Sequence, residues 1–302
     1  MTVSGRVVAC VAIAAFLPAC SIRKTAVNKL GDALAETGSS FASDEDPELV
    51  GDAIPFGLKT MEALLAESPR HQGLLLAACS GFVQYAYGWI QLEADYEAEE
   101  SLARATLLRE RARKMYLRAL GYGLRGIEVD HEGIRSRLNA DPGAALEDMK
   151  KEDVPLLYGT AAAWAGAMAL KINDSEVSAD QPIVEARARR ALDLDPSWEM
   201  GSIHEFFVSW ESGRSSIGGS KERALEHYEE ALRLSRGLKA SPHVTYAESI
   251  SIPEQDRAAF TAALEKALAV DATEPNDQRL VNILMHKRAS WLLKRVDEYF
   301  IE

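Results

Sequence analysis

The sequence is poor in cysteine, with only Cys10, Cys20 and Cys79 among 302 residues. No two of them form a CxxC pair, so neither a zinc site nor a redox-active disulfide is supported. Cys79 lies in the apolar stretch LLLAACSGF, which predicts a small buried side chain. A chain of this length can bury a sizeable core without disulfides or metals.

Basic residues are scarce relative to acidic ones. The 34 Lys and Arg against 46 Asp and Glu give a formal charge of -12 at pH 7. Binding to nucleic-acid phosphates needs a surplus of positive charge, so a nucleic-acid partner is not expected. The content of 47% hydrophobic and 26% charged residues is that of a soluble globular protein.

Catalytic and metal-binding motifs are missing. The 6 histidines form neither HExxH nor an i, i+4 pair, and no GxSxG elbow occurs. Gly218-Gly219-Ser220 before Lys221 resembles part of a phosphate loop, but the full Walker pattern is absent and a turn with Ser220 as N-cap explains it better. We therefore predict no enzyme, no metal and no cofactor. A helical hydrolase without a recognisable motif is the alternative.

Residues 1–19 have the parts of a secretory signal peptide. Arg6 precedes an uncharged stretch from Val7 to Ala19, shorter than the roughly 20 residues that span a bilayer. The LPAC ending resembles a bacterial lipobox, although Pro18 departs from its usual small residue. We predict cleavage before Cys20 and lipidation of Cys20, which would tether the protein to a membrane. The alternative is a signal peptide with Cys20 left free.

The predicted domain organisation has a 1–19 lipoprotein signal peptide and a 20–45 lipidated N-terminus with linker and short helical segment. A single helical domain is expected over 46–302. No alternating run rich in Val, Ile or Thr occurs, so strands are not predicted and the fold class is all-α.

Helix boundaries follow from capping residues. Asp46 is predicted as an N-cap with Pro47 at the first helical position, and Pro55 predicts a kink or break in that helix. A helix is expected over 101–120, ended by Gly121 and Gly123.

Further boundaries are expected in the second half of the chain. Residues 155–171 are rich in Ala and Gly and should form a central buried helix. Ser197 is a candidate N-cap for the helix that follows it. A last helix should cover roughly 277–300.

A weak repeat runs through the helix ends, at Ala63, Ala119, Ala191, Ala231 and Ala267. Several of the spacings are close to the period of about 34 in tetratricopeptide repeats. Small residues at fixed helical positions let paired helices approach, and each pair buries its open face on the next. We predict an array of antiparallel helix pairs, an α-solenoid-like bundle of degenerate tetratricopeptide-like repeats. An irregular helical bundle is the alternative.

Large aromatic side chains occur on helices that should face inward. We expect most of them in the core and a minority lining a cavity between helices. They are Trp89, Trp164, Trp198, Phe206, Phe207, Trp210 and Trp291.

Several stretches together resemble a known family. They are PFGLKTMEALLAESP (55–69), GLLLAACSGFVQYAY (73–87), SWESGR (209–214), GGSKERALEHYEEAL (218–232), ASPHVTYAESISIPEQDRAAF (240–260) and RASWLLKRVDEYF (288–300). From Asp46 onward the chain resembles the T component, or TatT family, of tetratricopeptide-repeat-associated TRAP transporters, a bacterial periplasmic lipoprotein.

The resemblance implies a function in transport. T components are all-helical and are implied to trimerise and to dock a periplasmic substrate-binding protein, the P component. A cavity through each protomer would pass a small hydrophobic or organic-acid ligand to that partner. The resemblance implies a periplasmic, lipid-anchored protein, and Ser21 favours the outer-membrane inner leaflet if the source is Gram-negative. An envelope lipoprotein scaffold for protein assembly is the alternative.

The family signatures SWESGR and ASPHVTYAES supply the candidate ligand- or partner-binding residues. The resemblance implies a cavity or partner surface, with Arg214 available to an anionic ligand. The alternative is that these residues fix turns between repeats and that Arg214 pairs with a nearby carboxylate. The candidates are Trp210, Glu211, Arg214, Ser241, Pro242, Tyr246 and Glu248.

Overall fold

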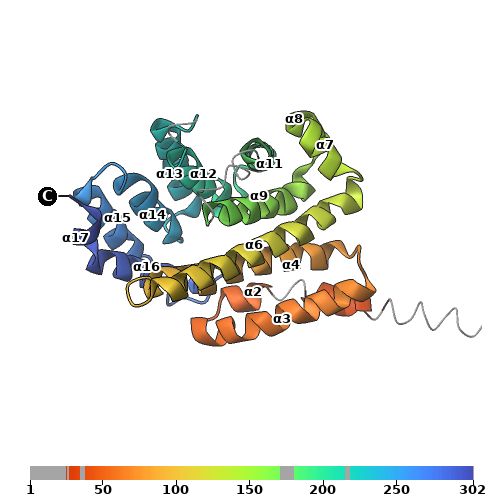
Figure 1. Ribbon diagram of the computed structural model, residues 1–302, viewed down its shortest axis with the longest axis horizontal. Helices are drawn as coiled ribbons and strands as arrows, with labels where there is room; N and C mark the ends of the chain where they lie inside the picture. Colours follow the sequence, from red (N-terminus) through yellow and green to blue (C-terminus); the bar gives the residue numbers. More distant parts are fainter. Residues whose placement is uncertain (1–24, 26, 35–37, 171–179, 215–217, 302) are drawn as a thin grey trace, which may run out of the picture.

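The computed structural model describes residues 25, 27–34, 38–170, 180–214 and 218–301, whose secondary structure is entirely helical (Figure 1). The predicted all-α class is confirmed, while the repeat organisation and the domain boundaries stay predictions. Cys20 and the predicted signal peptide lie outside the described residues.

The first half of the chain forms long helices that run side by side, with α3, α4, α6 and α9 in succession (Figure 1). Residues 27–34 are also helical. The elements are α2 (Gly38–Ala42), α3 (Pro47–Glu67), α4 (Gln72–Tyr85), η1 (Ala86–Gln91), α5 (Leu92–Glu97), α6 (Leu102–Asp130), α7 (Ile134–Ala140), α8 (Pro142–Ala145), η2 (Lys151–Asp153) and α9 (Val154–Ala169).

The second half forms shorter helices, and α16 returns to pack on α2 and α3. Arg279 of α16 pairs there with Glu45. The elements are α11 (Gln181–Leu194), η3 (Trp198–Met200), α12 (Ser202–Ser212), α13 (Lys221–Ser235), α14 (Ser241–Tyr246), η4 (Ala247–Ser251), α15 (Arg257–Leu268), α16 (Arg279–Lys294) and α17 (Val296–Tyr299). The predicted single last helix is therefore wrong, because the chain leaves helical geometry at Arg295.

The start of α3 confirms its predicted cap. The Asp46 carboxylate accepts hydrogen bonds from the backbone N–H groups of Glu48 and Leu49, both at 3.0 Å. The predicted break at Pro55 is wrong, since α3 continues through it. One missing backbone hydrogen bond is outweighed here by the burial of Ile54 and Leu58 on either side.

The predicted end of α6 at Gly121 and Gly123 is also wrong, because the helix continues to Asp130. A Cβ on Gly123 would lie 2.5 Å from Thr160 Cγ2 and 2.8 Å from Cys79 Sγ. Gly123 therefore serves the close approach of α6 to both α4 and α9, and this contact outweighs its low helix propensity.

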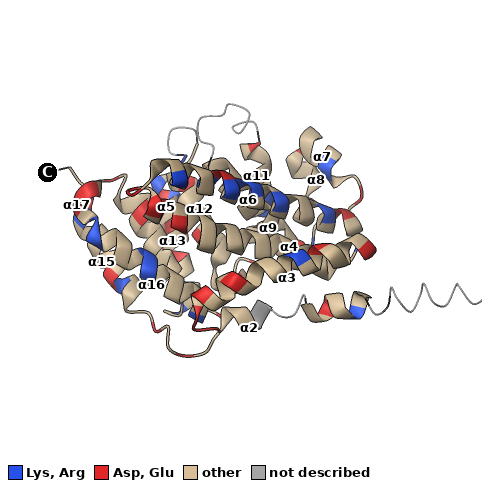
Figure 2. Ribbon diagram, turned by 60° about the horizontal axis from the view of Figure 1, so that its bottom comes forward, with Lys and Arg blue, Asp and Glu red and all other residues tan. Residues whose placement is uncertain are grey.

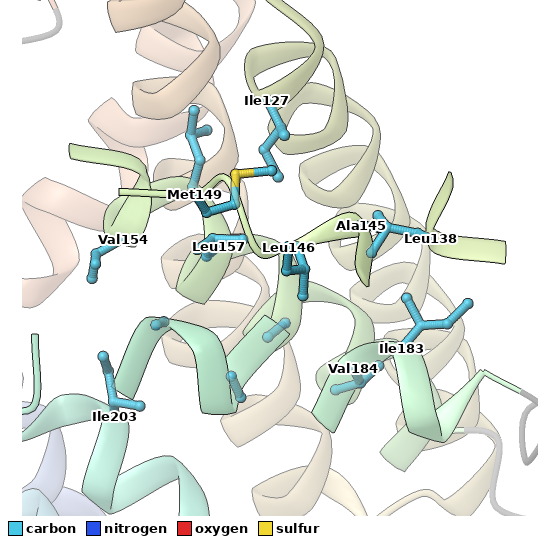
Figure 3. Packing of buried hydrophobic residues seen from close by; sticks show 14 of the residues in the cluster. Ile127, Leu138, Ala145, Leu146, Met149, Val154, Leu157, Ile183, Val184 and Ile203 are labelled. Carbon is cyan, nitrogen blue, oxygen red and sulfur yellow. The ribbon is translucent and has the colours of Figure 1, made fainter. Parts of the chain in front are cut away.

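Helix α9 is the central buried helix, as predicted for 155–171 within the part described. Gly166 leaves room for the Tyr116 ring, which would lie 2.7 Å from an added Cβ. Figure 3 shows side chains from α6 to α12 converging on Leu146 and Leu157. Cys79 is a free, fully buried thiol, as predicted, and burial raises its pKa to about 12.

One continuous helical stretch among the described residues, Gln72–Glu97, is long and apolar enough to cross a membrane by length and composition. It packs against α3, α6 and α9. Its apolar side chains Leu74, Leu75 and Ile90 are fully buried there, so core packing accounts for its hydropathy.

Candidate functional site

Two turns of π-helix, η1 and η4, occur among the described residues, one in each half of the chain. η1 carries Tyr87 and η4 carries Glu248. Single π-helical turns interrupt the ordinary helical hydrogen bonding and are frequent at functional sites. The surroundings of Tyr87 and Glu248 are therefore candidates for a functional site.

Tyr87 lies near the Arg288 guanidinium and the Glu248 and Glu205 carboxylates. It is 38% exposed, yet burial raises the pKa of its phenol, and the Glu248 and Glu205 carboxylates raise it further. The same combination of access and a burial-raised pKa holds for Glu248. We call the group of Tyr87, Tyr158, Glu205, Glu248 and Arg288 the recess.

One wall of the recess is an ion network around Arg288. Its Nη2 donates to Glu248 Oε1 at 2.6 Å and to Asp95 Oδ2 at 3.1 Å, and its Nε also donates to Glu248 Oε1, at 3.1 Å. The guanidinium lies over the Trp291 ring, 4.6 Å from its centroid. Burial raises the pKa of Glu248, although Arg288 opposes the shift.

A second polar cluster surrounds Glu205 of α12. Lys239 is only 5% exposed, and its Nζ lies 3.0 Å from Glu205 Oε2 and 2.9 Å from Ser202 Oγ. The Ser241 hydroxyl donates to the same Glu205 oxygen at 3.0 Å. Tyr158 donates to the Ser202 carbonyl at 3.3 Å, which brings α9 to the start of α12.

Aromatic rings continue from Tyr158 along α12. The Tyr158 ring centroid lies 4.8 Å from that of Trp198 and 6.3 Å from that of Phe206. Phe206 stacks on Trp210 at 5.5 Å. Tyr158, Trp198 and Phe206 are each partly exposed, so this row offers apolar surface next to the polar recess.

The backbone before α12 has an unusual conformation. Glu199, Met200 and Gly201 have φ values of 42°, 54° and 86° in succession. Such left-handed runs cost free energy for residues other than glycine. The predicted N-cap Ser197 is wrong, since its side chain makes no capping hydrogen bond and α12 begins only at Ser202.

Of the predicted site residues, Glu211 lies in an ion network that joins α11, α12 and α13. Its carboxylate is 1% exposed and accepts from Arg189 at 2.8 Å and Arg223 at 2.6 Å. Burial alone would raise the pKa of Glu211, but these hydrogen bonds hold it below its usual range. The arrangement fastens three helices together.

The other predicted residues do not form one site. Arg214 pairs with Glu185 at 2.6 Å and covers the Trp210 ring at 4.7 Å, beside the Glu211 network. Ser241 and Glu248 bond into the recess. Tyr246 stacks on Tyr228 with centroids 4.5 Å apart, and Pro242 is buried in the first turn of α14.

Sequence reasoning missed Tyr87, Tyr158, Glu205 and Arg288 as recess residues. These four come from η1, α9, α12 and α16. Tyr87 and Arg288 lay in stretches quoted for the family resemblance, and Tyr158 and Glu205 on helices noted for aromatic residues, but nothing local indicated that the four converge.

Comparison with known proteins gives two findings. The family model TAtT, described as TRAP transporter T-component, matches residues 43–300. A protein of Treponema pallidum (strain Nichols), described as an uncharacterized protein, is 29% identical over 316 residues, which is 98% of this chain and 98% of that protein.

Proposed function

Because the chain belongs to the TRAP transporter T-component family, we propose that it docks the periplasmic substrate-binding P component of such a transporter. In this role it passes a small hydrophobic or organic-acid ligand through the recess. The family is one of transport accessories working at the cell envelope, not a known enzyme family. The match over residues 43–300 is the observation that carries the proposal.

The recess supports the ligand-passing part of the proposal. The Glu205 carboxylate lies near enough to the Tyr158 phenol to raise its pKa, and the partly exposed Tyr158 ring contacts that of Phe206. Small-molecule sites combine apolar lining with a few polar groups that fix orientation. The left-handed segment before α12 and the two π-helical turns border the same region.

The exposed face of α6 is a suitable docking surface. Leu107 is 66% exposed and Leu117 is 39% exposed, and the exposed Arg111, Lys114 and Arg118 share that face of the helix. Figure 2 shows the basic residues recurring along α6. On a chain of net charge -12, this basic and apolar face fits an acidic patch on a P component.

Lipidation of Cys20 would hold the helical domain at an envelope membrane on the periplasmic side, as the lipobox predicts. Residues 20–45 would connect the anchor to the domain. Self-association into trimers, which the family resemblance implies, belongs to the same proposal and is tested by sedimentation of the domain. If the source is Gram-negative, we place the anchor in the inner leaflet of the outer membrane.

The decisive experiment measures binding between this protein and a P component encoded beside it. The chain from residue 20 with Cys20→Ser is purified and titrated with the P component by isothermal calorimetry. We expect a dissociation constant of about 10 µM or tighter. No binding at several times that concentration, with both proteins folded, would reject the docking proposal and leave an envelope scaffold as the better account.

A further inference from the structure

The helical stretch 27–34, which follows the predicted lipid anchor in the sequence, is fastened to the turn between α3 and α4. The Ser68 hydroxyl donates to Asn28 Oδ1 at 2.8 Å. His71 Nδ1 accepts from the Leu74 N–H at 3.3 Å, so its Nε2 carries the ring hydrogen and donates to the Asn28 carbonyl at 3.1 Å. Two residues of the turn therefore hold Asn28 in place.

Close packing adds to these hydrogen bonds. The same Nε2 of His71 lies 3.2 Å from Asp32 Oδ1. Gly31 is buried against α4, where an added Cβ would lie 2.8 Å from Leu74 Cδ1 and 2.9 Å from His71 Nε2. Only a residue without a side chain lets the two helical stretches approach this closely. The stretch 27–34 is therefore part of the folded body of the protein.

This attachment leaves a short tether to the anchor. Asn28 is eight residues beyond Cys20, and eight residues span at most about 28 Å even when fully extended. A lipid on Cys20 lies in the membrane, so Asn28 and the turn Ser68–His71 must stay within that distance of it. A chain that first joined the domain at Asp46 could reach about 90 Å and would impose no orientation.

The turn between α3 and α4 lies at one end of the molecule. Arg70 Nη2 donates to the Val129 carbonyl at 2.9 Å, and Gln72 Nε2 donates to Asp130 Oδ2 at 2.7 Å, so the last turn of α6 lies beside the start of α4. Helices α15 and α17 lie at the opposite end (Figures 1 and 2). The short tether therefore selects which end is held near the membrane.

The surface at the tethered end carries groups that suit lipid headgroups. Lys29 and Leu30 are exposed on the 27–34 stretch, Leu30 by 51%. Arg70 is also exposed, and its hydrogen bond goes to a carbonyl rather than to a carboxylate. Basic side chains are attracted to the anionic headgroups of a bilayer, and leucine is suited to the boundary between headgroups and acyl chains.

We propose that this end of the domain, formed by the 27–34 stretch and the turn Ser68–His71, rests on the lipid headgroups of the membrane that holds Cys20. Lys29 and Arg70 face the headgroup phosphates. The inference rests on the proposed anchor at Cys20 and adds the orientation of the domain on the bilayer.

The orientation has a consequence for the proposed docking face on α6. This helix leads away from the bilayer, and Leu107 precedes Asp130 by 23 residues, which places it about 35 Å farther out along the helix axis. Leu107 and the basic residues beside it then stay accessible to a soluble P component.

The test couples the chain from residue 20, through its Cys20 thiol, to a maleimide lipid in vesicles of phosphatidylethanolamine and phosphatidylglycerol. Cys79 is fully buried, so Cys20 is the reactive thiol. An alkyne-bearing amino acid replaces either Pro69, in the turn, or Leu268, on α15, and carries a fluorophore. Both positions are exposed. Lipids with nitroxide headgroups then quench a fluorophore that reaches the membrane surface.

We expect the fluorophore at position 69 to lose about half of its emission or more, and that at position 268 less than about a tenth, since the tether holds only one end at the lipid. A flexible insertion of about 20 residues directly after Ser21 lengthens the tether and should reduce quenching at position 69. The same insertion directly before Gly38 lies beyond the fastened stretch and is the matched control, which should leave the quenching unchanged.

Equal quenching at positions 69 and 268 would overturn the proposal, as would quenching at neither position. So would equal effects of the two insertions in folded proteins. Chemical coupling makes these results independent of acylation in cells. Attachment in cells is tested separately with Cys20→Ser, so a failure of the anchor and a failure of the orientation give different results.

Discussion

His204 of α12 and His227 of α13 share a hydrogen bond between their Nδ1 atoms, which lie 2.9 Å apart. Such a bond requires one ring to donate and the other to accept, so at least the accepting ring is neutral. Burial lowers the pKa of His204, and burial together with the neighbouring His204 lowers the pKa of His227 to about 4. The helix pair is therefore joined by a contact that is lost when both rings are protonated.

This pair predicts that the protein loses stability on acidification. The unfolded chain takes up protons at these histidines near pH 6.5, while folded His227 resists until about pH 4, so the free energy of unfolding falls across that window. The part due to His227 should be about 2 kcal/mol, after allowance for partial exposure. Urea unfolding near neutral pH and at about pH 4.5 measures it.

The control for this prediction replaces the titrating ring. His227→Gln keeps a hydrogen-bonding side chain without the ionisation, so its stability should fall less on acidification. His286→Gln, on α16, should retain the full loss. Equal losses in both variants would show that other groups cause the acid sensitivity.

Two glycines within α6 predict opposite effects of the same substitution. Gly123→Ala should destabilise by about 1–3 kcal/mol, because its Cβ would press against Thr160 and Cys79. Gly121→Ala should stabilise by up to about 1 kcal/mol, because nothing lies within 4 Å of an added Cβ there. Thermal and urea unfolding of both variants tests the pair, and similar stabilities would contradict the packing account.

These glycines show why the sequence predicted the fold class but not every boundary. The caps Asp46 and Ser220 were predictable because an N-cap interacts only with the next few residues. Gly123 was read as a helix end because its contacts, Cys79 and Thr160, are distant in sequence. Local composition cannot distinguish a glycine that ends a helix from one that admits a neighbour.

The recess was less predictable for the same reason. Ser241 and Glu248 were selected through family resemblance, and both bond to recess residues. Tyr87 and Arg288 approach Glu248 only after the first and last parts of the chain have packed together. A π-helical turn is also a product of packing and has no sequence signature of its own.

The ion pairs of Glu211, which join α11, α12 and α13, should contribute measurably to the stability of the protein. Glu211→Gln should destabilise by about 2 kcal/mol, less than the ~3–5 kcal/mol of a fully buried pair, because Arg189 and Arg223 keep 41% and 44% exposure. Glu254→Gln breaks a half-exposed pair with Lys221 and should cost under about 1 kcal/mol. Calorimetric melting of the two variants measures both losses of stability. If Glu211→Gln destabilises the protein no more than Glu254→Gln does, the Glu211 ion pairs do not hold the three helices together.

If Cys20 is lipidated, as its position in the lipobox predicts, this residue alone should attach the protein to the envelope membrane. Cys20→Ser should move the protein from the membrane fraction to the soluble periplasmic fraction and abolish labelling by a radioactive fatty acid. Cys79→Ala, which changes a fully buried thiol, should leave the protein in the membrane fraction. Continued membrane association of Cys20→Ser would reject lipidation as the means of attachment.

The exposed face of α6 predicts where a P component docks. Leu107→Asp places a negative charge among the basic residues of that face and removes apolar contact area, so P-component binding should weaken at least about tenfold. Because Leu107 is 66% exposed, the melting temperature of the Leu107→Asp variant should hardly differ from that of the unmodified protein. Leu49→Asp alters a leucine of similar exposure, 61%, on α3 and should bind normally. If the two variants bind the P component equally well, docking occurs on another surface, because only the Leu107 change alters the α6 face.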